Sequence, residues 1–146
     1  MLWFHCAVVL LVVIATGVDL WRREIPNSVP LVILAMIPLA HVLATWAVPW
    51  WSHVIGCLVA LVAAMVIGWG DRFGGGDVKL FAALGGWFGL TAVLPLAIWT
   101  AIAGLPLALL AAWRGKEDMA YGPAILGGLC VHLAFPQLLW RIAGLV

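Results

Sequence analysis

Charged residues are scarce in this chain. Only 9% of its 146 residues are Asp, Glu, Lys or Arg, whereas 66% are hydrophobic. A soluble domain has about 25% charged and about 45–50% apolar residues, so the composition excludes an ordinary soluble domain and predicts an all-α polytopic membrane protein. Because a membrane-crossing helix needs about 20 residues, the length allows about six such helices with short loops, in a single membrane-embedded domain (1–146).

The chain also lacks the features that mark several other functional classes. Its three cysteines (Cys6, Cys57 and Cys130) lie far apart without a C-x-x-C pair, which argues against a zinc knuckle or a disulfide framework. The histidines do not form H-E-x-x-H, and His132, alone in an apolar stretch, is interpreted as a hydrogen-bonded interior residue. No basic run indicates nucleic acid. We therefore expect no metal, no cofactor and no nucleic-acid partner.

Apolar stretches alternate with short polar or proline-containing breaks. We predict helices over 2–19, 28–46, 53–70, 77–91, 93–113 and 122–142. Asn27 or Ser28 can cap the second helix, and Pro30 falls in its first turn, where a missing N–H has little effect. The first stretch has no basic segment before it and no clear cleavage site, so it is predicted to be a retained span rather than a signal peptide.

The few charges predict how the chain is oriented. Six of the seven Lys and Arg residues, and all six acidic residues, fall in or beside the first, third and fifth loops. Alternating spans place these three loops on one face, which the positive-inside rule makes cytoplasmic. The N-terminus is then expected on the outer face.

Two acidic residues lie at the ends of apolar stretches instead of within loops. Asp19 closes the first stretch, and Asp77 opens the fourth directly after Gly74, Gly75 and Gly76. An ionisable group in a membrane costs about 2.5–3.5 kcal/mol at the bilayer centre and usually marks function. The predicted topology puts both carboxyl groups at the same membrane boundary, where helix packing can bring them together.

Such a pair of carboxyl groups has a definite chemistry. Two carboxyl groups held a few ångströms apart cannot both ionise easily, so they share one proton. The ionised group can accept a proton from water while the protonated group donates to a carbonyl, which hydrolyses a peptide bond without a metal. The glycines before Asp77 are expected to adopt backbone conformations closed to other residues and to let a substrate strand approach closely.

These segments resemble the two sequence elements of the type IV prepilin peptidases, which are membrane aspartic proteases. The segment 74–80 (GGGDVKL) resembles the family's G-x-G-D signature with its following lysine, and 19–27 (DLWRREIPN) resembles the family's helix-end aspartate followed by an arginine and I-P-N. The segment 121–124 (YGPA) is similar to the start of the family's last core helix. The resemblance spans nearly the whole chain.

The resemblance implies an endopeptidase with Asp19 and Asp77 as its catalytic pair. The other matching positions, near the substrate, are Gly74, Gly75, Gly76, Lys79, Arg22, Pro26 and Asn27. The implied substrate is a prepilin, with a short basic leader, a glycine before the cut and then an apolar helix, cleaved on the cytoplasmic side of a bacterial inner membrane. Full-length family members carry an N-terminal insertion with paired C-x-x-C motifs, associated with zinc and N-methylation. That region is missing here, so we expect the minimal branch that serves Flp (Tad-type) pili.

Two other functional classes remain open. A small transporter or channel component could use the two aspartates to relay protons or to bind a cation, and a pilus machine could contain such a chain as a non-catalytic subunit. The other polar residues in the predicted spans, Thr45, Thr91, Thr100 and His132, do not form a pathway, which favours the protease.

Individual residues also have simpler interpretations. Asp19 could pair with Arg22 or Arg23 at a helix end, and Asp77 could be favoured by the helix dipole alone. Lys79 could bias the ionisation of the pair or contact a lipid phosphate. Glu24 and the charges in the later loops are interpreted as solvated. The sequence indicates neither which pilin is cut nor the oligomeric state.

Overall fold

Six helices make up the part of the chain that the computed structural model describes, which is residues 2–22, 24–43, 48–67, 74–114, 121–138 and 141. They are α1 (Leu2–Arg22), α2 (Ser28–Leu43), α3 (Trp50–Ile67), α4 (Gly75–Phe88), α5 (Leu90–Trp113) and α6 (Gly122–Ala134). No strand occurs in these residues. The predicted all-α membrane fold is confirmed.

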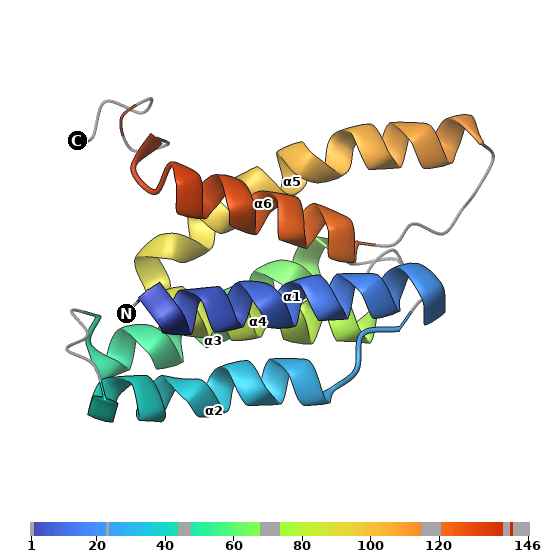
Figure 1. The fold of residues 1–146 in the computed structure, drawn as a ribbon. Helices are drawn as coiled ribbons and strands as arrows, with labels where there is room; N and C mark the ends of the chain where they lie inside the picture. Colours follow the sequence, from blue (N-terminus) through green and yellow to red (C-terminus); the bar gives the residue numbers. More distant parts are fainter. Residues whose placement is uncertain are drawn as a thin grey trace.

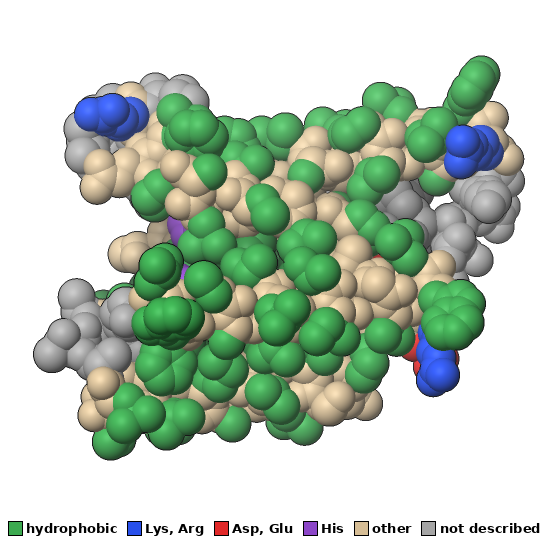
Figure 2. All heavy atoms as spheres, viewed as in Figure 1, with side chains coloured by type: hydrophobic (Ala, Val, Ile, Leu, Met, Phe, Trp, Pro, Cys, Tyr) green, Lys and Arg blue, Asp and Glu red, His purple; other side chains and the backbone are tan. Residues whose placement is uncertain are grey.

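The lengths of the helices differ from one to the next. Among the described residues, α1 and the stretch Leu90–Ala111 of α5 are long and apolar enough to cross a membrane. The stretches Ser28–Leu43, Trp50–Val66 and Gly122–Ala134 are apolar but shorter. Figure 2 shows hydrophobic side chains covering the visible face of the bundle, with Lys and Arg side chains only towards its ends.

Helix α4 lies at the centre of the bundle. Every residue from Leu80 through Trp87 is buried, and α4 packs against α2, α3 and α5. In Figure 1, α1, α2 and α6 lie in front, and α4 runs behind α1. Because Asp77 is in the first turn of this central helix, the packing of α4 decides where that carboxyl group sits.

Small residues let α4 approach its neighbours closely. A Cβ atom at Gly56 of α3 would overlap the backbone of Gly85 and Gly89, and Gly85 itself lies against Ala60. A Cβ atom at Gly86 would come within 3.1 Å of the Leu34 side chain. The small-x-x-x-small spacing of Gly85 and Gly89 therefore serves close helix packing, as such patterns do in membranes.

The break between α4 and α5 falls at Gly89, whereas the predicted helices 77–91 and 93–113 leave the break at 92. Gly89 has a φ of +83°, in the region that favours glycine. Side chains in the first turn of α3 contact backbone polar groups on both sides of this break. The Ser52 hydroxyl accepts a hydrogen bond from the Leu90 N–H (3.0 Å), and the Nδ1 atom of His53 lies 2.7 Å from the carbonyl oxygen of Gly86.

Four other helix boundaries differ from the prediction, and one of them is the start of α4, which lies at Gly75 instead of 77. Helix α6 ends at Ala134 instead of 142, because Pro136 disfavours helical backbone at Phe135, where φ is −136°. Helix α1 continues to Arg22, three residues past Asp19, and α3 begins at Trp50, directly after Pro49, instead of at 53. The predicted ends of the second and third helices at 46 and 70 lie outside the described residues.

Exchange of Gly89 for alanine is expected to destabilise the protein. A side chain at this φ costs about 1–3 kcal/mol, and the new Cβ atom would lie 2.8 Å from the Ser52 hydroxyl oxygen. Gly89→Ala should therefore lower the midpoint of thermal unfolding in detergent. Gly17→Ala is the matched control, because a Cβ atom there meets none of the described residues within 4 Å. It should leave the midpoint unchanged or raise it, and equal losses in both variants would show that the break does not depend on Gly89.

Candidate active site

Asp19 lies in the last turn of α1, and its side chain is only 4% exposed. Its Oδ2 atom accepts a hydrogen bond of 2.9 Å from the backbone N–H of Gly122, the first residue of α6. One turn earlier on α1, the Thr16 hydroxyl donates to the carbonyl oxygen of the same Gly122 (3.1 Å). The end of α1 is therefore attached to the start of α6 by two buried hydrogen bonds.

Asp77 lies in the first turn of α4 and is 5% exposed. Its Oδ2 atom accepts a hydrogen bond from the N–H of Gly74 (3.2 Å), and its own N–H donates to the carbonyl oxygen of Gly74 (3.0 Å). Its Oδ1 atom is buried and has no hydrogen-bond partner among the described residues. A buried oxygen without a partner costs about 1–3 kcal/mol, so this atom is free to bind water or a substrate.

The two carboxyl groups line one pocket of about 290 Å³. Its other lining residues are Glu24, Ile25, Asn27, Gly74, Gly75, Gly76 and Lys79. Because Asp19 and Asp77 line this one pocket, the charge of either carboxyl group disfavours ionisation of the other. The structure thus brings together the two predicted acids, which lie 58 residues apart in the chain and belong to different helices.

Comparison with known proteins gives the family. Residues 6–109 match the model of the type IV leader peptidase family. The chain belongs to this family. It is 30% identical over 142 residues to a protein of Pectobacterium carotovorum subsp. carotovorum named prepilin leader peptidase/N-methyltransferase. The aligned region covers 88% of this chain and 50% of the Pectobacterium protein. Proteins of the same name in two strains of Burkholderia pseudomallei are 35% identical over 78 residues, or 51% of this chain and 25% of theirs.

This member of the leader peptidase family spans between a quarter and a half of the length of these relatives. No solved structure matches it. The catalytic role of Asp19 and Asp77 stays a prediction, since the comparisons assign no role to single residues.

Lys79 and Asn27 connect the two sequence elements of the family. The Lys79 Nζ atom donates a hydrogen bond of 2.8 Å to the Asn27 Oδ1 atom. The lysine of the G-x-G-D segment therefore holds the I-P-N segment against the pocket. In this structure the Asn27 side chain bonds Lys79, and the Pro26 carbonyl accepts the N–H of Val29 (3.1 Å). Arg22 is exposed and does not line the pocket.

The expected role of the glycines before Asp77 is wrong in one respect. Gly74 has φ −63° and ψ 145°, an extended conformation open to any residue, and Gly75 and Gly76 are helical. Gly74 and Gly76 are needed for space instead. A Cβ atom at Gly76 would lie 2.8 Å from the Ile25 Cβ atom, and one at Gly74 would lie 3.1 Å from the Asp77 Oδ2 atom. Among the described residues, a Cβ atom at Gly75 would meet nothing within 4 Å.

Sequence reasoning missed four residues of this site, one of which is Ile25 in the pocket lining. Glu24 was interpreted as a solvated loop charge, but it lines the pocket. Thr16 and Gly122 were not assigned to the site, although both are buried next to Asp19. A signal was available for Thr16, because residues three apart on a helix share a face. Arg23, Asp71, Arg72, Lys116, Glu117 and Asp118 lie outside the described residues.

The four histidines lie away from the pocket, around the C-terminal end of α4. His5 and His132 contact Phe88 with ring-centroid distances of 5.7 and 5.3 Å, and the Nε2 atoms of His41 and His53 are 2.9 Å apart. His132 is buried as predicted, but its Nδ1 atom has no hydrogen-bond partner among the described residues. Nowhere in the described residues do three His, Cys, Asp or Glu side chains form a group that could hold a metal ion.

The two adjacent glycines of the signature give a direct test of the space argument. Gly76→Ala forces the Ile25 segment to move, and such overpacking costs about 1–3 kcal/mol. It should lower the thermal unfolding midpoint in detergent, whereas Gly75→Ala should not. Equal decreases of the midpoint in the two variants would contradict the space argument and favour backbone conformation as the reason for these glycines.

Proposed function

We propose that this protein is a membrane-embedded aspartic endopeptidase that removes the short basic leader from type IV prepilins of the Flp (Tad) type. Its catalytic groups would be Asp19 and Asp77, acting with a water molecule and no cofactor. The observation that carries the proposal is that both carboxyl groups are buried in one pocket, where the Asp77 Oδ1 atom has no hydrogen-bond partner among the described residues. Membership of the type IV leader peptidase family supports the same substrate class.

The reaction needs one ionised and one protonated carboxyl group. The ionised group takes a proton from water while the water oxygen bonds the scissile carbonyl carbon, and the protonated group gives its proton to the carbonyl oxygen. When the tetrahedral intermediate collapses, the C–N bond breaks and the leaving nitrogen receives the proton taken from water. One of the two hydroxyl groups of the intermediate gives its proton to the carboxyl group that had protonated the carbonyl oxygen. Water is thus added across the peptide bond, and both carboxyl groups regain their starting states.

The surroundings of the pocket suit a prepilin. Glu24 is exposed in the pocket lining and offers a carboxylate to a basic leader. Gly75 has no described neighbour within 4 Å of the position of a Cβ atom, which suits the approach of extended substrate backbone. Extended backbone is required because a helix hides the carbonyl that water must attack. The apolar helix that follows the cut would lie in the bilayer alongside the enzyme.

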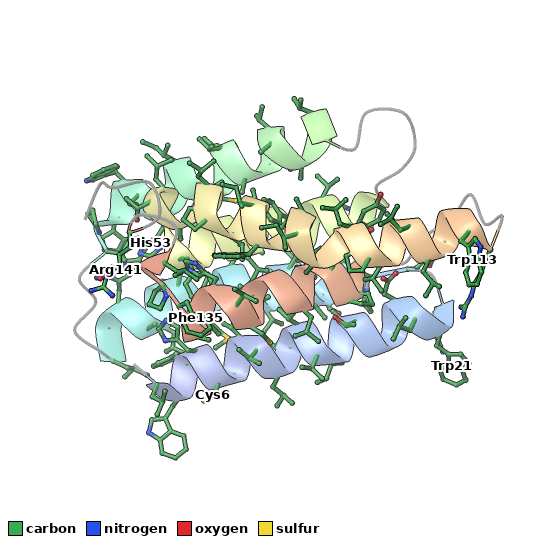
Figure 3. The ribbon with its side chains drawn as sticks, turned by 90° about the horizontal axis from the view of Figure 1, so that it is seen from above. Cys6, Trp21, His53, Trp113, Phe135 and Arg141 are labelled. Carbon is green, nitrogen blue, oxygen red and sulfur yellow. The ribbon has the colours of Figure 1, made fainter. Side chains whose placement is uncertain are left out.

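The proposed location is a bacterial inner membrane, with the N-terminus outside and the pocket at the cytoplasmic face. Different side chains lie at the two ends of the helix bundle, as expected if the ends face opposite sides of the membrane. Figure 3 shows Trp21 and Trp113 at one end of the bundle and His53 and Arg141 at the other. Asp19, two residues before Trp21, belongs to the first end.

Removal of either carboxyl group should abolish cleavage. Asp19→Asn and Asp77→Asn keep the size of the side chain but prevent ionisation, so the acid and base roles cannot both be filled. The double variant should be no less active than either single variant, since the two residues act as a unit. The measurement is the gel shift of a prepilin co-expressed with each variant.

The controls for this experiment are Asp71→Asn and Asp118→Asn, which should keep substantial activity. Glu24→Gln is not a suitable control, because Glu24 lines the pocket. If Asp77→Asn still processes prepilin while Asp71→Asn does not, the wrong carboxyl group has been chosen. If both Asp19→Asn and Asp77→Asn remain active, the protease proposal fails and a small transporter or a non-catalytic pilus subunit is favoured.

The orientation can be measured with reporter fusions. A reporter that is active only outside the cytoplasm should be active when fused after Pro49 and silent when fused after Gly115, as the positive-inside rule requires. The reverse pattern would put the pocket on the face opposite to a cytoplasmic leader and would contradict the proposal.

A further inference from the structure

Asp19 is held differently from Asp77. Thr16, Asp19 and Gly122 form a buried chain in which the Thr16 hydroxyl donates to the Gly122 carbonyl and the Gly122 N–H donates to the Asp19 Oδ2 atom. Thr16 is 6% exposed and Asp19 is 4% exposed, so water does not compete freely for these bonds. Both polar groups of Gly122 are thereby used by α1.

We propose that Thr16 and Gly122 are positioning residues that keep Asp19 as the ionised member of the pair. Asp19 then takes the proton from water, and Asp77 gives its proton to the scissile carbonyl oxygen. This inference rests on the proposed peptidase function and adds to it which carboxyl group is base and which is acid.

The start of α6 stabilises a negative charge on Asp19. Gly122 is the first residue of a 13-residue helix, and the first N–H groups of a helix have no acceptor within it. The N-terminus also carries a partial positive charge. A carboxylate that accepts such an N–H forms a charge-assisted hydrogen bond, which is stronger than a neutral one.

Asp77 receives weaker support as an anion. It lies at the start of its own helix, but its bond from the Gly74 N–H is 3.2 Å long, against 2.9 Å for the bond from Gly122 to Asp19. Its Oδ1 atom is buried without a partner among the described residues. Because the two groups share one pocket and disfavour a second charge, the proton goes to the less well stabilised group, which is Asp77.

Gly122 can occupy this position only because it has no side chain. A Cβ atom there would lie 2.8 Å from the Asp19 Oδ2 atom and 3.1 Å from the Thr16 Cα atom. Thr16 then fixes Gly122 from the carbonyl side, so that its N–H stays directed at Asp19. Loss of the hydroxyl group should loosen this alignment while it leaves every other group of the pocket in place.

Other titratable and charged groups also act on Asp19. Those that share the pocket are Asp77, Glu24 and Lys79. Arg22 follows on the same helix and is exposed, and Tyr121 precedes Gly122. Thr16 itself carries no charge, so exchanging it changes the support of Asp19 without changing the charge of the site.

The experiment compares Thr16→Val with Thr16→Ser in the purified full chain. The substrate is a synthetic peptide with a basic leader, a glycine and an apolar segment, and kcat, KM and the pH dependence of cleavage are measured. Thr16→Val should lower kcat about fivefold to tenfold, as expected for one net hydrogen bond, with KM nearly unchanged. The acidic limb of its pH profile should move to higher pH, because Asp19 must be ionised to act as the base. Thr16→Ser keeps the hydroxyl group and should behave as the unmodified protein does.

Thr100→Val is the matched control. Thr100 is also buried on a helix packed against a glycine of α6, Gly128, but its hydroxyl group has no hydrogen-bond partner among the described residues. It should leave kcat and the pH profile unchanged. If Thr16→Val does not fold, Thr16→Ala removes the same hydroxyl group without adding volume and should give the same pH shift.

The outcomes separate this inference from the function on which it rests. An unshifted pH profile in Thr16→Val, or equal losses in the Val and Ser variants, overturns the positioning role while Asp19→Asn remains inactive. Cleavage that persists in Asp19→Asn overturns the peptidase proposal itself.

Discussion

Burial of two carboxyl groups in an apolar bundle is the constraint on which the rest of this structure depends. Such groups are tolerated away from water only when polar partners meet them. Here the partners are backbone N–H groups at helix starts, Gly122 for Asp19 and Gly74 for Asp77. The start of α6 must therefore reach the end of α1, and the glycine segment must lead directly into α4.

Packing around α4 meets this constraint with small residues. Gly85 and Gly56 let α4 and α3 approach closely, and Gly76 lets the start of α4 lie against Ile25. The hydrogen bond from Lys79 to Asn27 ties the same two segments together on the exposed side. The pocket is thus the meeting point of the end of α1, the segment that follows it and the start of α4.

Much of this arrangement could be predicted from the sequence. The features that could not be predicted depend on contacts between residues that are far apart in the chain. The positions of Asp19 and Asp77 at the ends of apolar stretches, on the same predicted face, were enough to place them together. The bond from Gly122 to Asp19 joins residues 103 positions apart, and no local pattern contains it. The glycines before Asp77 were assigned to unusual backbone conformations, yet Gly76 is explained by its distance from Ile25, which only the packed structure gives. The positive φ is found at Gly89 instead, at the break between α4 and α5.

The pH dependence of prepilin cleavage by the unmodified protein tests the central claim most directly. If Asp19 and Asp77 share one proton and both take part, kcat/KM should rise and then fall with pH, because only the singly protonated pair is active. A rate that keeps rising to alkaline pH would contradict the account, since no protonated carboxyl group would then be needed.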